Sequence, residues 1–461
     1  MKISQLTRRD WLKCVGLGTG AMFVNAANFV SDSKADFVYK EDMTSGELLD
    51  GSQATPCQLQ NGTIVRPKFN VPQIHETDVL VIGGGPAGTV AAIAAARAGV
   101  KTTIVERYGY FGGLSTGGLV LHILGHWTID NGQKIQVCQG IGEEMMQRLE
   151  AFPNGIIKRE FGKNPTIDAE AYKYLLVEMI TEANIDVFLH SWAIDAIIDD
   201  EVDSQTGNAI LRGVVIQTKL GPQAILARQI IDATGDGDVF SMAGAAHTQR
   251  LYSIGLPHRL GNLDRVTPNK SPKPRFLGDA TPVPGVRWVN MGGPVADGID
   301  VKTLSELELK HRKQIWKQVQ QIKATPGYEE VYLMETASQI GVRITRVIEG
   351  MKTLTLEDAR ANKQFDDCIG VGGAWNGDHI GWRIPLGALL PTNIENLLTA
   401  GRSISGEPKM SDVIRVIPNC WVSGQGAGCA AAIAVQQDCL VRNVPIEPVQ
   451  QLLKNQNAYL C

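Results

Sequence analysis

Three side chains in the C-terminal half of the chain have types and spacings that suit proton transfer and anion binding. His379 lies in the glycine-rich stretch GGAWNGDHIGW, and an imidazole can accept or return a proton near neutral pH. Arg343 and Arg346 lie three residues apart in IGVRITRVIEG and would share one side of a helix. Arginine can hold an anion by two parallel hydrogen bonds, and it also forms structural ion pairs, so both interpretations stay open.

A second pair of candidates, His122 and His126, lies four residues apart in LVLHILGHWT. They could share a helix face, and a metal site would need further ligands, of which the sequence identifies none. We therefore expect no metal.

A glycine turn in the stretch DVLVIGGGPAGTVAAIAAARAGVKTTIVER predicts a nucleotide site. The stretch has the pattern of a strand, a G-x-G-x-x-G turn at Gly83, Gly85 and Gly88, an alanine-rich helix and a second strand. The glycines permit a tight turn, a close approach of a pyrophosphate and close helix–strand packing, and the helix N-terminus favours the phosphate charge. Glu106 follows 23 residues after Gly83, where its carboxylate can accept hydrogen bonds from ribose hydroxyls. The unit therefore predicts a bound dinucleotide.

Further glycine-rich segments suit a long, extended cofactor. RYGYFGGLSTGG contains two glycine pairs, and a later apolar strand runs into Ala233-Thr234-Gly235-Asp236. Near the C-terminus a strand leads into Gly401-Arg402, and we expect a second helix to start at the glycines Gly424 to Gly428.

Taken together, these motifs resemble the FAD-dependent oxidoreductase family, whose nucleotide fold is similar to glutathione reductase and to the flavoprotein subunits of fumarate reductase. The resemblance runs from about Asp78 to Val435 and includes IGEEMMQRLE, PTIDAEAYKYLLVEMI, FDDCIGVGG and IRVIPNCWVSGQGAG. It implies an FAD cofactor and a final helix whose dipole points at the flavin ring. It also implies that a histidine after FDD and GG marks the domain junction facing the flavin, which makes His379 the leading catalytic candidate.

The residues that the resemblance and the motifs assign to FAD fall in seven short segments. They are Gly83, Gly85, Pro86, Ala87, Gly88, Glu106, Arg107, Gly113, Leu114, Ser115, Ala193, Ala233, Gly235, Asp236, Gly401, Arg402, Gln425, Gly426 and Ala427. The catalytic candidates are His379, Arg343 and Arg346. His122 and His126 could lie on the far side of the flavin instead of sharing a helix face.

Some absences narrow the expected chemistry. No second G-x-G-x-x-G follows a strand in the middle third, so a dedicated NAD(P)H domain is not expected and an external electron carrier must exchange electrons. Covalent attachment in fumarate-reductase-like proteins uses a histidine just before the glycine pair, and here that stretch is RYGYFGG. We therefore expect non-covalent FAD. No C-x-x-C occurs, and Cys420 and Cys429 are interpreted as small core residues.

The βαβ unit and the family resemblance imply an α/β fold, and the chain length predicts two domains. The 461 residues are 44% hydrophobic and 20% charged with a net charge of −4, so a large core is expected and nucleic-acid binding is not. The predicted fold is a Rossmann-like FAD-binding domain, built from a parallel sheet and a β-meander, with an inserted α+β substrate domain. Its parts are an export signal over 1–30, an extension or linker over 31–75, the first FAD-binding part over 76–245, a substrate domain over 246–366, a return segment over 367–440 and a tail over 441–461.

The N-terminal stretch LTRRDWLKCVGLGTGAMFVNAANFV resembles a twin-arginine export signal. Arg8 and Arg9 precede a mildly apolar stretch and a small-residue cleavage candidate near Ala26. That route exports folded, cofactor-loaded proteins, which suits a flavoprotein. The predicted location is the periplasm, with no stable membrane span after signal removal.

Two functions remain open from the sequence. The first is an oxidoreductase that transfers a hydride between a small organic substrate and flavin N5, with His379, Arg343 and Arg346 orienting the substrate. The second is a lyase-like enzyme for a sugar-acid type of substrate, in which FAD is structural.

Overall fold

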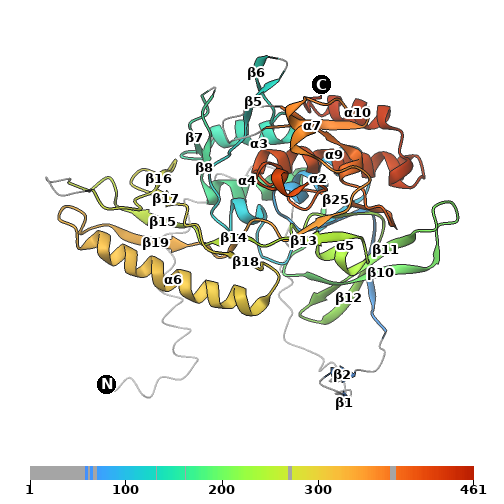
Figure 1. Cartoon of the computed structure of the whole chain (residues 1–461), viewed down its shortest axis with the longest axis horizontal. Coiled ribbons are helices and arrows are strands. Elements are labelled where there is room, and N and C mark those ends of the chain that lie inside the picture. Colours follow the sequence, from blue (N-terminus) through green and yellow to red (C-terminus); the bar gives the residue numbers. More distant parts are fainter. Residues whose placement is uncertain are drawn as a thin grey trace, which may run out of the picture. The chain divides into compact units, whose positions relative to one another are not determined.

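The first βαβ unit lies at the centre of an eight-stranded sheet (Figure 1). The computed structural model describes residues 70–130, 132–160, 162–267, 273–373 and 381–460, and the backbone of two strands before them. Strand β3 (Gln73–Ile82) runs parallel to β4 (Thr102–Val105) on one side and to β12 (Gly221–Asp232) on the other. Helix α2 (Pro86–Arg97) connects β3 to β4, as the glycine turn predicts. Buried Val and Ile side chains along both strands explain why they form interior strands.

Strand β12 belongs to both parts of the sheet. Its first half pairs antiparallel with β11 (Ala209–Thr218), which pairs with β10 (Trp192–Val202), and these three strands form the predicted meander. Its second half runs parallel to β3 and to β25 (Leu397–Thr399). The parallel part also contains β9 (Asp186–Phe188) beside β4, while β24 (Ile394–Glu395) extends β11. The predicted fold class, a Rossmann-like parallel sheet with a meander, is confirmed.

Helix α9 (Ile417–Gln436) corrects one sequence prediction. The glycine-rich run Gly424 to Gly428 lies in the middle of this helix, and the helix begins seven residues earlier. The glycines serve packing instead. A Cβ on Gly424 would lie 2.2 Å from the carbonyl oxygen of Ala87 in α2, and one on Gly428 would lie 2.2 Å from that of Ala91. The glycines therefore let two helix backbones touch.

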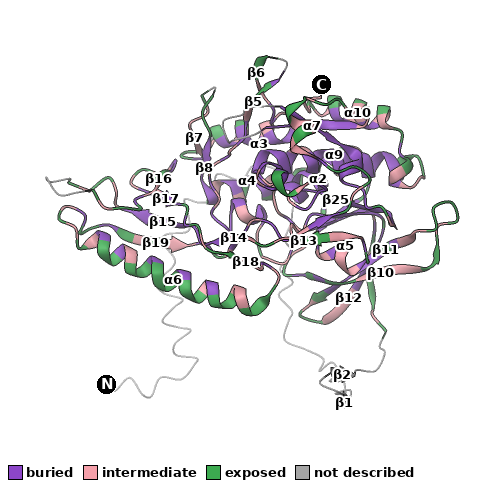
Figure 2. Ribbon diagram, viewed as in Figure 1, coloured by how far each residue is buried: buried purple, intermediate pink, exposed green. Residues whose placement is uncertain are grey.

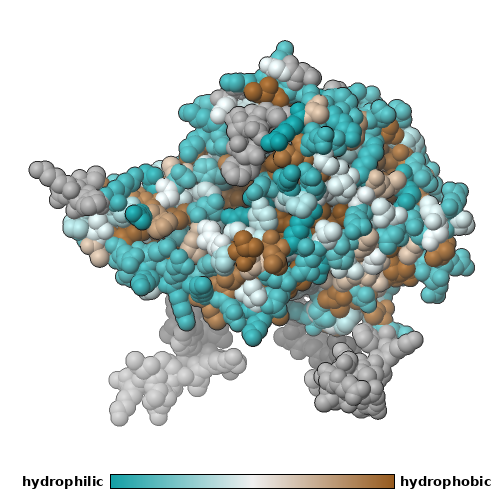
Figure 3. All heavy atoms as spheres, in the orientation of Figure 1, coloured by the Kyte–Doolittle hydropathy of each residue, from teal (hydrophilic) through white to brown (hydrophobic). Residues whose placement is uncertain are grey.

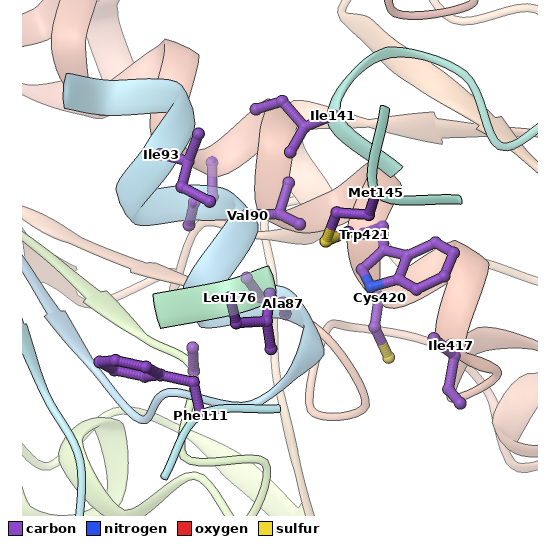
Figure 4. Packing of buried hydrophobic residues seen from close by; sticks show 14 of the residues in the cluster. Ala87, Val90, Ile93, Phe111, Ile141, Met145, Leu176, Ile417, Cys420 and Trp421 are labelled. Carbon is purple, nitrogen blue, oxygen red and sulfur yellow. The ribbon is translucent and has the colours of Figure 1, made fainter. Parts of the chain in front are cut away.

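Figure 4 shows this helix contact from close by, with Ala87 and Val90 of α2 near Cys420 and Trp421 of α9. Nearly every side chain along α2 and α9 is buried (Figure 2). Because α2 starts at the glycine turn, this packing fixes the position of that turn relative to the start of α9.

The segment between β12 and β24 contains small sheets and one long helix. Helix α6 (Val301–Lys323) buries Leu307, Ile315, Val319 and Ile322 and exposes a charged outer face, as its apolar periodicity predicts. Figure 3 shows mainly hydrophilic residues over that face. The strands of this segment are β13 (His247–Gln249), β14 (Tyr252–Gly255), β15 (His258–Gly261), β16 (Asp279–Ala280), β17 (Arg287–Val289), β18 (Val295–Ala296), β19 (Tyr332–Thr336), β20 (Gly341–Val342), β21 (Arg346–Ile348), β22 (Cys368–Gly372) and β23 (Trp382–Pro385).

The other elements complete the described chain. The helices are α3 (Gly140–Glu150), α4 (Ala169–Glu182), α5 (Asp238–Met242), α7 (Leu356–Arg360), α8 (Ser411–Ile414) and α10 (Ile446–Asn455), and the strands are β5 (Trp127–Asp130), β6 (Gln133–Gln136), β7 (Ile156–Ile157) and β8 (Thr166–Ile167). The chain divides into two compact units, 1–69 and 70–461. In the first unit, β1 (Gln58–Gln60) pairs antiparallel with β2 (Thr63–Val65). The predicted export signal lies outside the described residues.

Candidate functional site

One cavity of the 70–461 unit brings together segments that lie far apart in the sequence. The parallel strands β3, β4, β12 and β25 end at one edge of the sheet, where their following loops meet. The assigned residues that line this cavity are Gly83, Gly85, Pro86, Ala87, Glu106, Arg107, Gly113, Leu114, Ala193, Ala233, Gly235, Arg343, Gly401 and Arg402. Most of the residues assigned to FAD are thus brought together by the fold.

The glycine turn has the shape that a dinucleotide requires. Gly83 has φ of +101°, and a Cβ there would lie 2.5 Å from the carbonyl oxygen of Ala233. A Cβ on Gly85 would meet nothing within 4 Å, so this position opens into the cavity. Gly88 does not line the cavity. A Cβ on Gly88 would lie 1.8 Å from the carbonyl oxygen of Gly83, so this glycine permits close helix–strand packing. The three glycines fit a pyrophosphate at the start of α2.

Glu106 is held in place by its own backbone surroundings. Its carboxylate accepts hydrogen bonds from the backbone N–H of Gly84 (2.6 Å) and of Tyr108 (2.8 Å). Burial raises the pKa of Glu106, and these two hydrogen bonds oppose that rise. A carboxylate has about four acceptor positions, so each oxygen retains capacity toward the cavity that Glu106 lines. The arrangement fits the hydroxyls of a ribose.

Beside Glu106, flat side chains line the same part of the cavity. The guanidinium of Arg107 lies 5.0 Å from the ring centre of Tyr108 and 5.2 Å from that of Trp192. All three residues line the cavity. Sequence reasoning identified Arg107 but missed the two aromatic residues, although Tyr108 directly follows the fingerprint acid and its neighbour.

Asp236 and Arg402 form an ion pair next to the glycine turn. The guanidinium of Arg402 donates to the carboxylate of Asp236 (2.6 Å) and to the carbonyl oxygen of Val342. Arg402 lines the cavity and Asp236 does not. The carboxylate of Asp236 therefore positions Arg402.

Arg343 and Arg346 occupy different surroundings, and neither lies on a helix. Arg346 begins β21 and pairs with the carboxylate of Asp238 (3.1 Å), which supports its structural interpretation. Arg343 lines the cavity and donates to the carbonyl oxygen (2.9 Å) and hydroxyl (3.3 Å) of Ser253. Burial lowers the pKa of Arg343. Of the two arginines, only Arg343 lines the cavity.

Several assigned residues do not line the cavity. Ser115 is buried at the end of the short 3-10 helix η2 (Gly113–Ser115). Gln425, Gly426 and Ala427 lie in the middle of α9, where the side-chain oxygen of Gln425 accepts from the backbone N–H of Ile141 (3.3 Å). The start of α9 reaches the cavity through Ile417. His379 lies outside the described residues.

The two other candidate histidines also differ. His122 and His126 lie outside any helix, so of the two predicted alternatives the shared helix face is wrong. His122 lines the cavity with its ring centre 4.7 Å from that of Trp288, and burial lowers its pKa. Within the described part of the chain, its Nε2 is buried without a hydrogen-bond partner. His126 is buried outside the cavity lining.

The remaining lining residues come mostly from the segment after β12 and from the start of α9. They are Ile82, Val105, Val120, Leu124, Ser191, Thr234, Asp238, Gly255, Pro257, Trp288, Asn290, Met291, Gln339, Gly341, Ala400, Arg415, Ile417 and Cys420. None of these was assigned to the site individually, although Thr234 lies in the Ala233-Thr234-Gly235-Asp236 segment that sequence reasoning placed there. The sequence context could have marked Arg415 as a site residue, because it is the single cation in the mostly apolar stretch DVIRVIP, just before a helix. Burial raises the pKa of Cys420 to about 12, so this thiol stays protonated.

The fold and the cavity define a dinucleotide-binding redox protein, and the comparison with protein families agrees. The family described as FAD dependent oxidoreductase matches residues 78–250 and 266–453. The chain belongs to this family. It is an FAD-dependent oxidoreductase, and its cofactor is FAD.

Individual relatives are more distant. A thiamine thiazole synthase from Metallosphaera sedula is 28% identical over 183 residues, which are 39% of this chain and 60% of the synthase. One from Sulfolobus acidocaldarius is 28% identical over 185 residues, 39% of this chain and 62% of the synthase. The match thus spans about three fifths of these relatives. A geranylgeranyl bacteriochlorophyll reductase-like protein from Thermoplasma acidophilum has a TM-score of 0.44 and 15% identity over 83% of each chain.

No group of three or more His, Cys, Asp or Glu side chains among the described residues could hold a metal ion. No helix among the same residues has the length and apolar character needed to cross a bilayer.

Proposed function

We propose that the protein is an exported dehydrogenase that transfers a hydride between a small organic substrate and flavin N5, with an external electron carrier. The main observation behind this proposal is the set of residues that line one cavity. The cradle for the dinucleotide and the polar side chains Asn290, Gln339 and Arg343 line the same space. A small molecule bound by these side chains would therefore lie beside the cofactor, as redox transfer requires.

The chain's own residues would bind and orient the reactants. The loop at Gly83 and Gly85 holds the diphosphate, and Glu106 holds the ribose. FAD supplies a two-electron acceptor at flavin N5. Trp288 is 4% exposed and helps to exclude water from the cavity. His122 can accept a proton from a substrate hydroxyl through its Nε2, which makes no hydrogen bond among the described residues and lies 3.7 Å from a carboxylate oxygen of Asp279.

Anaerobic screening of small organic compounds tests the redox reaction. We expect at least one compound to bleach the flavin absorbance. Turnover with an unchanged flavin spectrum would contradict the dehydrogenase and support the lyase-like alternative. The external carrier is tested in the same assay, where a bleached enzyme should be reoxidised by a dye acceptor and not by NAD⁺.

Export and non-covalent binding of FAD are proposed from the sequence and have their own tests. Replacing Arg8 and Arg9 with lysine should retain the precursor in the cytoplasm, and continued export of the variant would contradict the signal. Acid precipitation should release the yellow colour into the supernatant. A yellow pellet would contradict non-covalent binding.

A further inference from the structure

Two arginines from separate segments line the same cavity. Arg343 lies between β20 and β21, and Arg415 lies between α8 and α9. Burial lowers the pKa of Arg343, the positive charge of Arg415 adds to that lowering, and the negative charge of Asp412 opposes it. Two positive charges that line the same half-buried cavity repel each other. A bound anion would reduce this repulsion.

Among the described residues, Arg343 lacks the acidic partner that the other arginines of this region have. Arg402 pairs with Asp236, and Arg346 pairs with Asp238. Arg343 has no ion pair among the described residues, and its hydrogen bonds go to neutral oxygens of Ser253.

Arg415 donates through Nη2 to Asp412 (2.5 Å), while its Nε is buried and has no hydrogen-bond partner in the described part of the chain. Asp412 is thus the acidic partner of this pair, and its single negative charge faces two guanidinium charges. The cavity holds excess positive charge at this place.

The apolar part of the cavity lining suits an organic acid better than an inorganic anion. Trp288 is buried, and its ring lies next to that of His122. The indole Nε1 donates to the carbonyl oxygen of Leu119, which fixes the orientation of the ring. Val120, Leu124 and Met291 add apolar surface to the same cavity. Burying a carbon skeleton against this surface contributes binding free energy that a bare ion lacks.

We propose that Arg343 and Arg415 together bind the carboxylate of a small organic acid, which is the substrate of this enzyme. The proposal rests on the proposed dehydrogenase function and names its substrate class. The carboxylate receives hydrogen bonds from both guanidinium groups, and Trp288 and the apolar side chains contact the carbon skeleton. Arg346 has no part in binding, because Asp238 already neutralises it.

Benzoate and benzamide are matched probes for this site, since they differ in charge and share one ring. Each is titrated into the oxidised holoenzyme, and binding is measured by the change in flavin absorbance. We expect benzoate to bind at least about tenfold more tightly than benzamide, as a charge-assisted hydrogen bond implies. Equal affinities, or no spectral change with benzoate, would overturn the proposal.

Two variants test whether Arg343 and Arg415 are the residues that bind benzoate. Arg343→Gln and Arg415→Gln should each weaken benzoate binding about tenfold or more and leave benzamide binding unchanged. Arg212→Gln is the matched control, because this arginine pairs with Asp199 outside the cavity lining. Wild-type benzoate affinity in both cavity variants would overturn the proposal. If either variant fails to retain FAD, the test rests on two other measurements. These are benzoate binding by Arg343→Lys and the preference of the wild-type protein for benzoate over benzamide.

The probe titration separates this proposal from the proposed function, because it requires no turnover. Benzoate preference without bleaching by any compound would uphold the anion site and contradict the dehydrogenase. Bleaching by neutral compounds alone would uphold the dehydrogenase and contradict the anion site.

Discussion

Glu106 offers a direct test of the cofactor site. In Glu106→Gln an N–H₂ group replaces one carboxylate oxygen and faces a backbone donor, either the N–H of Gly84 or that of Tyr108. Loss of the charge-assisted bond to the ribose should weaken FAD binding by about 1.5–3 kcal/mol. Titration of the apoprotein with FAD measures this change.

Glu330→Gln is a suitable control for that experiment, because Glu330 is exposed and pairs with Arg265 outside the cavity lining. It should leave FAD affinity unchanged. If Glu106→Gln binds FAD as tightly as the wild type, Glu106 does not hold the ribose.

His122 is a candidate for proton transfer that the structure places in the cavity. Burial lowers the pKa of His122, so its imidazole is neutral near neutral pH and can accept a proton. His122→Asn should retain FAD and slow substrate-driven flavin reduction by about 10²–10⁴-fold. The rate of the wild type should fall as acid protonates the imidazole, and the variant should lose this dependence. Anaerobic stopped-flow absorbance measures both.

His190→Asn serves as the matched control, because His190 is exposed and has a positive φ that asparagine tolerates. A wild-type rate and pH profile in His122→Asn would exclude His122 as the base. His379→Ala, the variant that the sequence prediction favours, belongs in the same series.

Helices α2 and α9 act as one packed unit, and Gly424 tests their contact. Alanine is a better helix former than glycine by about 1 kcal/mol, so Gly424→Ala would stabilise an isolated helix. Here a Cβ would lie 2.2 Å from the backbone oxygen of Ala87, which cannot move without displacing α2. We expect a net loss of about 1–3 kcal/mol in the free energy of unfolding, measured by urea denaturation.

Gly292→Ala is the control for Gly424, since a Cβ on Gly292 meets nothing within 4 Å. Because α2 begins at the glycine turn, Gly424→Ala should also weaken FAD binding. Unchanged stability would mean that the two helices separate without cost.

The stability of the whole molecule should depend on pH through His126. Burial and the charge of Arg159 lower the pKa of His126 to about 3, and a guanidinium N–H of Arg159 lies 3.2 Å from its Nε2. The unfolded chain has the ordinary histidine pKa of about 6.5. Between these values the unfolded state binds more protons than the folded state, so stability falls as the pH drops below about 6.5.

The expected loss is at most about 1.4 kcal/mol per pH unit for this group. His126→Gln keeps an acceptor for Arg159 and removes the titration. Urea unfolding at neutral and at mildly acidic pH should therefore show a smaller acid loss in the variant than in the wild type. An identical loss in both proteins would assign the acid sensitivity to other groups.

The elements that could be predicted from sequence are those with local signals. The βαβ unit from β3 to β4, the strands β10 to β12 and the amphipathic helix α6 follow from apolar periodicity and turn residues close in sequence. The glycine turn and Glu106 also belong to one short unit. Most of the residues assigned to FAD line the cavity, whereas Tyr108 and Trp192 of the same lining were missed.

Other features depend on packing between distant segments. The glycines of α9 resemble a helix start in sequence, and only the backbone of α2 beside them reveals that they serve a helix contact. The sequence pattern does not distinguish Arg343 from Arg346. In the fold, Asp238, which is more than 100 residues away in sequence, neutralises Arg346. Arg415, Trp288 and His122 meet because three separate segments converge on the cavity, and no local pattern encodes such convergence.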